Sequence, residues 1–230
     1  MPRKTVTNWG NYPTIEAEVT ASADRSAIRQ LVENSDHLIA RGNGRCYGDS
    51  SLGKNIFSTL RLNKFIEFDR ENGIIECESG VLLSEVLDVI VPAGFFLPVT
   101  PGTKFITVGG AVAADVHGKN HHCDGSFANH VVHMDLMAED ASIIRCSPFE
   151  NRELFWRTFG GMGLTGIILS MKFRLNPIET AFIQQQSFKT PDLESTMKIF
   201  ASSAGSTYSV GMARLFRGET SVGPLDRNVR

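Results

Sequence analysis

The sequence lacks several features that define broad classes of proteins. No apolar run approaches the roughly 18–20 residues of a membrane-spanning helix, so we expect no transmembrane segment. Positive charge is not in excess, because 23 lysines and arginines face 25 acidic residues and the formal net charge is −2. This balance predicts no nucleic-acid partner. The basic residues near the N-terminus are followed by no apolar stretch, which does not fit a secretory signal and predicts a cytoplasmic location.

Cysteine is also scarce. The four cysteines, Cys46, Cys77, Cys123 and Cys146, form no C-x-x-C pair and fit no zinc-binding spacing, so we predict isolated thiols and no metal site. Hydrophobic residues make up 42% of the chain and charged residues 21%. This composition is ordinary for a globular protein and predicts a packed core.

The hydrophobic pattern predicts an α+β fold, in which strands run in groups and helices are scattered among them. The expected helices are 23–34, 84–91, 150–159 and 191–201. The expected strands are 37–40, 56–62, 64–69, 74–79, 131–138, 142–146, 164–175, 182–188 and 208–215. A fresh β-α-β pattern starts near residue 178 and then stops, so we expect the second domain to be cut short.

A glycine-rich loop follows the strand predicted at 37–40. Glycines permit positive φ and let backbone N–H groups approach an anion such as a pyrophosphate. The third glycine comes too late for the Rossmann fingerprint, and the G-K-[ST] of a Walker loop is missing. Taken alone, the loop fits a plain glycine-rich turn as well as a phosphate cradle. The candidate cofactor residues in it are Arg41, Gly42, Asn43, Gly44, Arg45, Cys46, Tyr47, Gly48 and Ser50.

A second segment carries the same kind of signal. The small residues that follow Thr107 predict a tightly packed helix whose N-terminal N–H groups face an anion. The segment begins at Pro101-Gly102-Thr103 and continues into the string H-G-K-N-H-H at residues 117–122. Two phosphate-suited segments are much harder to dismiss than one.

Several strings in this order carry a family resemblance. They are R-G-N-G-R-C-Y-G-D, P-G-T, V-G-G-A, D-V-H-G-K-N-H-H, G-S-F-A-N-H-V and G-G-M-G-L-T-G-I. Over about residues 8–176 the chain resembles the vanillyl-alcohol-oxidase-type family, and within it the polyprenyl-phosphoryl-ribose 2′-oxidases. The resemblance implies a PCMH-type FAD-binding domain of two α/β subdomains at 1–176. It also implies the beginning of an incomplete substrate domain at 177–230.

The resemblance further implies roles for individual residues. The glycine loop would wrap the FAD pyrophosphate, and Ile167 would contact the cofactor through its backbone. His117 and Lys119 would lie on the substrate side as the catalytic candidates. The second segment would line the cofactor through Pro101, Gly102, Thr103, Thr107, Val108, Gly109, Gly110, Ala114, Asp115, Val116, His117 and Gly118.

The attachment of the cofactor can be judged from one position. Many members of the family tether flavin through a histidine in a G-x-G-H-S loop, and Arg45 stands at the equivalent place. Arginine cannot make that bond, so we predict non-covalent FAD. Cys46 offers a thioether as the alternative.

The histidines admit a second interpretation. His117 and His121 have the i, i+4 spacing of a zinc helix, but Gly118 would break the helix and Lys119 would repel a metal. His37, His130 and His133 are interpreted as structural hydrogen-bonding residues.

The resemblance implies oxidation of a sugar CH–OH group by hydride transfer to FAD, with a base that takes the hydroxyl proton. The substrate would be a sugar or a lipid-linked sugar, such as a polyprenyl-phosphoryl ribose oxidised at C2′. A reductase partner would then complete an epimerisation, and peripheral membrane contact is compatible with such a substrate. The alternatives are a flavin-binding module without turnover and an aldonolactone or alditol oxidase.

Overall fold

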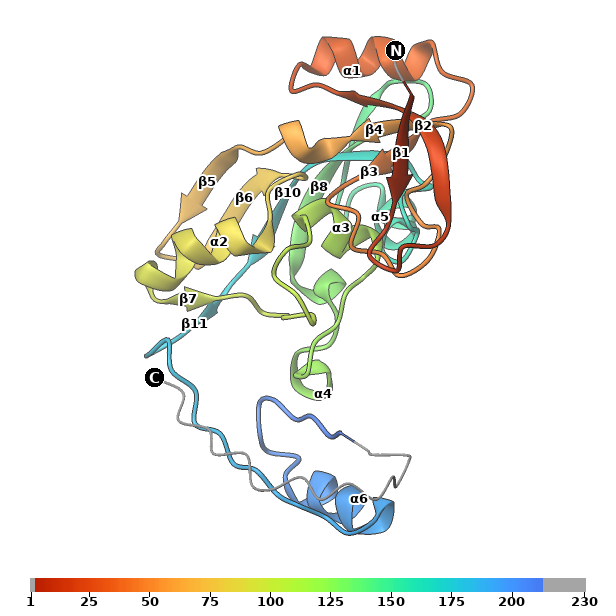
Figure 1. The fold of residues 1–230 in the computed structure, drawn as a ribbon. Helices are drawn as coiled ribbons and strands as arrows, with labels where there is room; N and C mark the ends of the chain where they lie inside the picture. The colour runs from red at the N-terminus through yellow and green to blue at the C-terminus, as the bar shows by residue number, and fades with distance from the viewer. Residues whose placement is uncertain (1–2, 213–230) are drawn as a thin grey trace. The chain divides into compact units, whose positions relative to one another are not determined.

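The computed structural model describes residues 3–212, and the chain divides into two compact units, Met1–Gln184 and Gln185–Arg230. The first unit is built on a four-stranded sheet, a five-stranded sheet and a two-stranded pair (Figure 1). Its mixture of helices and sheets confirms the α+β prediction. The predicted boundary at residue 176 falls within strand β11 (Asn176–Pro177), which pairs with β7 (Phe95–Phe96).

The four-stranded sheet has the order β1-β2-β4-β3. Its strands are β1 (Arg3–Thr7), β2 (Thr14–Ala21), β3 (Ile39–Arg41) and β4 (Asn55–Ser58). Strand β1 is antiparallel to β2, and β4 is parallel to both β2 and β3. Helix α1 (Arg25–Glu33) connects β2 to β3 and starts where the Asp24 side chain accepts from the Ser26 N–H. The arrangement delivers the chain from β3 directly into the glycine loop.

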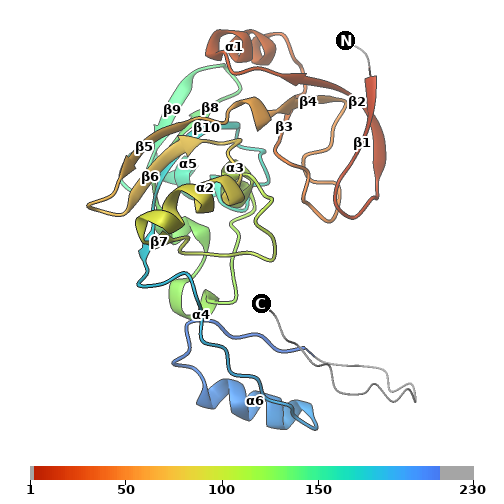
Figure 2. The same cartoon turned by 60° about the vertical axis from the view of Figure 1, so that its left-hand side comes forward.

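The five-stranded sheet is entirely antiparallel, in the order β5-β6-β10-β8-β9. Its strands are β5 (Phe65–Asp69), β6 (Ile74–Glu78), β8 (Val131–Met137), β9 (Ile143–Cys146) and β10 (Ile167–Arg174). Its apolar side chains share a buried core with α2 (Leu83–Ile90), α3 (Val108–Ala113) and α5 (Arg152–Thr158). Figure 2 shows α2 and α3 lying over this sheet. On the opposite face, Met137, Ile167 and Leu169 belong to a second buried apolar cluster, which also includes Ile28 of α1. Lys172 is paired there with Glu67 and Glu76.

Most predicted elements of the first unit are confirmed, with shifts of a few residues at their ends. The strand expected at 56–62 is shorter, because β4 ends at Ser58 and a 3-10 turn (Thr59–Arg61) follows. Gly80 packs beside this turn, where its N–H donates to the Leu62 carbonyl oxygen with 2.7 Å between nitrogen and oxygen.

The strand expected at 182–188 is wrong, because these residues form no regular element. The neighbouring apolar side chains Phe182 and Ile183 remain exposed, at 86% and 79%. A strand is stabilised by pairing with a neighbour, and no strand within residues 3–212 pairs with this segment. Of the strand expected at 208–215, residues 208–212 are also irregular, and residues 213–215 lie outside the described part.

The second unit contains α6 (Leu193–Ser202), which confirms the helix expected at 191–201. The Asp192 side chain caps it by accepting from the Ser195 N–H at 2.7 Å. Across the described helices, none combines the length and the apolar character that crossing a bilayer requires.

Candidate functional site

The structure brings the two glycine-rich segments together. A Cβ atom at residue 42 would lie 2.3 Å from Thr107 Oγ1, so only glycine allows this approach. The Asn43 side-chain amide donates to the Phe105 carbonyl oxygen at 2.8 Å, 62 residues along the chain. The prediction that both segments form one site therefore has a direct physical contact behind it.

The glycine loop keeps its backbone N–H groups free of protein partners. Within residues 3–212, no N–H of residues 43–49 donates to a protein acceptor. The loop carbonyls, in contrast, are used: the Gly44 oxygen accepts from the Trp9 N–H at 3.0 Å, and the Gly48 and Ser50 oxygens accept from the Asn8 amide. Gly44 also takes a positive φ of 61°, which glycine adopts without steric cost. A run of free N–H groups in a turn is a suitable binding surface for an anion.

The start of helix α3 behaves differently from the prediction. Its first N–H groups were expected to face an anion, and this is wrong because protein oxygens already accept from them. The Val108 N–H donates to the Val81 carbonyl and the Gly109 N–H to the Ser79 carbonyl, both at 2.8 Å. The Gly110 N–H donates to Thr107 Oγ1 at 3.1 Å. The start of α3 is thus closed by packing against the 79–81 turn, whereas the N–H groups of residues 43–49 stay free of acceptors within residues 3–212.

The two arginines of the loop have different environments. Arg41 is committed to the protein, since its guanidinium donates to Asn8 Oδ1 and to the Thr7 carbonyl oxygen, the latter at 2.7 Å. Burial lowers the pKa of this guanidinium, which nevertheless stays charged.

Arg45 makes no ion pair among the described residues. Its Cζ lies 5.4 Å from the Trp9 ring centroid and 5.9 Å from that of Phe105. Its Nε is buried and has no hydrogen-bond partner in the described structure. An uncompensated buried donor of this kind is costly unless a ligand accepts from it.

A third segment, the loop before β10, joins the site. The Met162 N–H donates to the Ala113 carbonyl oxygen at the end of α3, at 2.9 Å. Gly163 has a φ of 82°, and a Cβ there would lie 4.0 Å from the Ala40 carbonyl oxygen. Ile167 follows, 5% exposed, as the first residue of β10. The loop thus approaches both α3 and the strand that leads into the glycine loop.

The chain turns sharply after α3. Asp115 takes a positive φ of 40°, and its carboxylate accepts from the Ala128 N–H at 3.0 Å. Val116 accepts from the Phe127 N–H, and His117 bridges to Ser126. This turn carries the H-G-K-N-H-H string away from α3.

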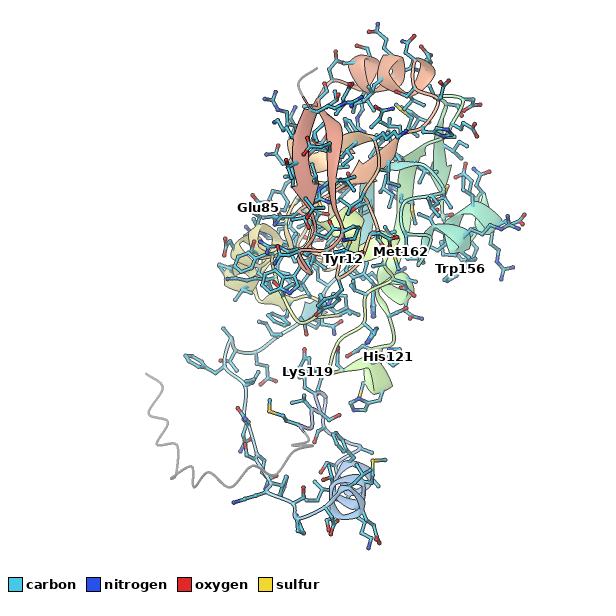
Figure 3. All side chains as sticks on the ribbon, turned by 45° about the vertical axis from the view of Figure 1, so that its right-hand side comes forward. Tyr12, Glu85, Lys119, His121, Trp156 and Met162 are labelled. Carbon is cyan, nitrogen blue, oxygen red and sulfur yellow. The ribbon has the colours of Figure 1, made fainter. Side chains whose placement is uncertain are left out.

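His117 and Lys119 are both exposed. Figure 3 shows Lys119 near α4 (His121–Asp124) and His121 at the start of that helix, both below Tyr12 and Met162 in that view. His117 precedes α4 rather than sharing a helix with His121, although their ring centroids are 5.4 Å apart. In the described ranges, no group of three His, Cys, Asp or Glu side chains could hold a metal ion.

Asn120 anchors the string. It is fully buried, and its amide donates to the Pro98 carbonyl oxygen at 2.7 Å and to the Asp124 carboxylate at 2.6 Å. Gly118 packs on the Thr100 backbone, where a Cβ would lie 2.7 Å from the Thr100 oxygen. The string is therefore fixed to the 98–100 segment, and the exposed side chains at 117 and 119 extend from an anchored backbone.

Other predicted residues lie at the rim. Tyr47 is 82% exposed, and the space beside Gly102 is open. Cys46 Sγ lies 4.0 Å from Ser51 Oγ. An open groove lies between the β1–β2 turn and the glycine loop, lined by Gly10, Tyr12, Pro13, Tyr47, Gly48 and Asp49.

Sequence reasoning missed the contribution of residues 7–9. Thr7, Asn8 and Trp9 contact both loop arginines and three loop carbonyls. The segment contains no glycine-rich or catalytic motif, and its role follows only from the close approach of the β1–β2 turn to the loop.

The free N–H groups of the glycine loop are chemically suited to an anion such as a pyrophosphate. A family model described as FAD binding domain matches residues 16–147, more than half of the chain. The chain therefore belongs to this family of FAD-binding proteins, and FAD is its cofactor.

Three relatives show the range of the family. Decaprenylphosphoryl-beta-D-ribose oxidase of Mycolicibacterium smegmatis is 34% identical over 218 residues, which cover 91% of this chain and 47% of the relative. L-gulonolactone oxidase of Scyliorhinus torazame is 27% identical, with 77% and 42% covered. D-lactate dehydrogenase of Anaerostipes hadrus is 27% identical, with 74% and 38% covered. The chain thus spans less than half the length of each relative. All three names denote oxidoreductases, which makes the family one of FAD-dependent oxidoreductases.

Proposed function

We propose that this chain holds FAD without a covalent bond and serves the oxidation of a CH–OH group of a sugar in the cytoplasm. The observation that carries the proposal is the run of free N–H groups at residues 43–49. Gly42, just before this run, packs closely against Thr107 of the second segment. Such a run can donate to several phosphate oxygens at once, as a bound pyrophosphate requires. Arg45 adds a positive charge that no described acidic side chain neutralises, and its Nε has no hydrogen-bond partner. Arg41 instead stabilises the loop by donating to the Thr7 carbonyl oxygen.

The lining of the site extends from the glycine loop to Pro101–Gly110, Ala114–Gly118 and the backbone of Ile167. The contacts at Gly42, Met162 and Gly163 support this extent, because they join three distant segments around α3.

When bound, FAD supplies the acceptor for a hydride. Lys119 makes no ion pair within residues 3–212, so its ammonium group is available for a substrate phosphate or for a negative charge at the flavin edge. His117, also exposed, is the candidate to hold or accept the hydroxyl proton. Asn120 and Gly118 keep both residues on a fixed backbone.

The proposed substrate class is a polyprenyl-phosphoryl ribose oxidised at C2′, supported by the 34% identity to decaprenylphosphoryl-beta-D-ribose oxidase. A lipid-linked substrate would bring the protein into peripheral contact with a membrane. A reductase partner would be needed to complete an epimerisation.

Acid precipitation tests the mode of attachment. We expect the purified chain to show a flavin absorption spectrum and to release all of its FAD into the supernatant, because Arg45 cannot form the tether that a histidine makes. Yellow colour retained in the pellet would instead indicate a covalent bond, with Cys46 the residue to examine by Cys46→Ser.

Anaerobic reduction tests the substrate class. We expect a short-chain polyprenyl-phosphoryl ribose to bleach the flavin absorbance of the FAD-bound chain, and free alditols, aldonolactones and lactate to leave it unchanged. Bleaching by alditols or aldonolactones alone would favour an oxidase of that type. Bound FAD that no donor bleaches would indicate a flavin-binding module without turnover of its own.

A further inference from the structure

We propose that Asn8 is a positioning residue of the cofactor site, which sets the direction of the N–H groups in the glycine loop and thereby the affinity for FAD. This inference rests on the proposed role of the loop. Asn8 follows β1, lies outside the matched range 16–147 and is only 3% exposed. A buried asparagine in a surface turn needs partners for its whole amide, and the loop supplies all of them.

The Asn8 side chain joins the two ends of the loop. Its Nδ2 donates to the carbonyl oxygens of Gly48 and Ser50, both at 2.7 Å. Its Oδ1 accepts from the Arg41 guanidinium at the other end. Two carbonyls on one side and a guanidinium on the other leave a single chemically consistent orientation of this amide.

These bonds also determine where the free N–H groups point. In a trans peptide, the carbonyl of one residue and the N–H of the next lie in one plane and point in opposite directions. The bonds from Asn8 to the Gly48 and Ser50 oxygens therefore turn the N–H groups of Asp49 and Ser51 away from the β1–β2 turn. The Trp9 N–H, bound to the Gly44 oxygen at 3.0 Å, does the same for the N–H of Arg45.

The amide group is specifically required. A carboxylate at position 8 could still accept from Arg41, but it could not donate to the two carbonyls and would repel their oxygens. The peptides after Gly48 and Ser50 would then be free to rotate, and their N–H groups would lose the direction that a pyrophosphate needs. A rigidly oriented donor set binds more tightly than a mobile one, because less entropy is lost on binding.

The test is the dissociation constant of FAD for the folded chain, measured by quenching of flavin fluorescence at a temperature where circular dichroism shows native structure. We expect Asn8→Asp to raise this constant by about ten- to a hundredfold. This is the effect expected when one or two oriented hydrogen bonds from the loop to the charged pyrophosphate are lost. Asn34→Asp is the matched control. It makes the same chemical change on an exposed asparagine at the end of α1, so the constant should stay at the wild-type value.

If Asn8→Asp does not fold, Asn8→Ala removes the same bonds without adding a charge and should give a loss of the same size. A lower melting temperature with an unchanged dissociation constant for the folded chain would mean that Asn8 is merely structural, and would overturn the inference. A wild-type chain that does not bind FAD would instead contradict the proposed function. Normal binding by the wild type and by both Asn8 variants would contradict this inference alone.

Discussion

Substitution of Gly42 by alanine is expected to weaken FAD binding by about ten- to a hundredfold. The added Cβ would lie 2.3 Å from Thr107 Oγ1 and 3.1 Å from Thr107 Cγ2. Thr107 cannot easily move aside, because it is 2% exposed and its hydroxyl caps α3 through the Gly110 N–H. Overpacking of this kind costs about 1–3 kcal/mol, and here it is relieved most simply by separating the loop from the second segment. Titration of the apo chain with FAD measures the effect.

Two further variants make this result specific. Gly205→Ala adds the same methyl group in open space within the second unit and should bind FAD normally. Thr107→Ala removes the two atoms nearest to the new methyl group, at the cost of a helix cap worth about 1 kcal/mol. In the double variant, the two losses should therefore be less than additive. Wild-type affinity in Gly42→Ala would show that the close approach of the two segments is not needed for binding.

Replacement of Phe127 by alanine is expected to lower the free energy of unfolding of the apo chain by about 3–5 kcal/mol, the usual cost of removing a buried aromatic ring. Phe127 is fully buried in the core beneath the five-stranded sheet, with its ring centroid 5.4 Å from that of Phe173. Its N–H also closes the turn after α3 by donating to the Val116 carbonyl oxygen at 2.9 Å. Urea denaturation followed by circular dichroism gives the change.

The control for Phe127 is Phe149→Ala, which removes the same ring from a side chain that is 98% exposed. Its effect should stay within about 0.5 kcal/mol, as is usual for surface substitutions. Equal losses for the two variants would contradict the assignment of Phe127 to the core. In a chain of ordinary marginal stability, a loss of about 3–5 kcal/mol removes much of the total, so Phe127→Ala should also populate the unfolded state measurably.

The local elements of the first unit were predictable because their signals are local. The periodic apolar residues of α1, α2 and α5 and the hairpin of β8 and β9 lie where the pattern placed them. The sequence failed at 182–188, where a strand was expected but no described strand pairs with the segment. The residues of a segment show only whether it could be extended, whereas a strand is stable only where another strand pairs with it.

The site shows the same division. By itself, the sequence determined where the glycines of the loop stand, at 42, 44 and 48, and left a plain turn and a phosphate cradle both open. The family resemblance placed Arg45 where other members carry a tethering histidine. The tertiary structure decided which donors are available. It closed the start of α3 against Ser79 and Val81, and left residues 43–49 free.

The tertiary structure also gave the two loop arginines different environments, and it brought Asn8 into hydrogen-bonding contact with the loop. Arg41 became a support and Arg45 remained uncommitted, although the sequence presents them as equivalent. The physical reason is that a glycine permits local backbone conformations, such as a positive φ, whatever the rest of the fold. Whether an N–H group finds an acceptor depends instead on which distant segments come within hydrogen-bonding distance.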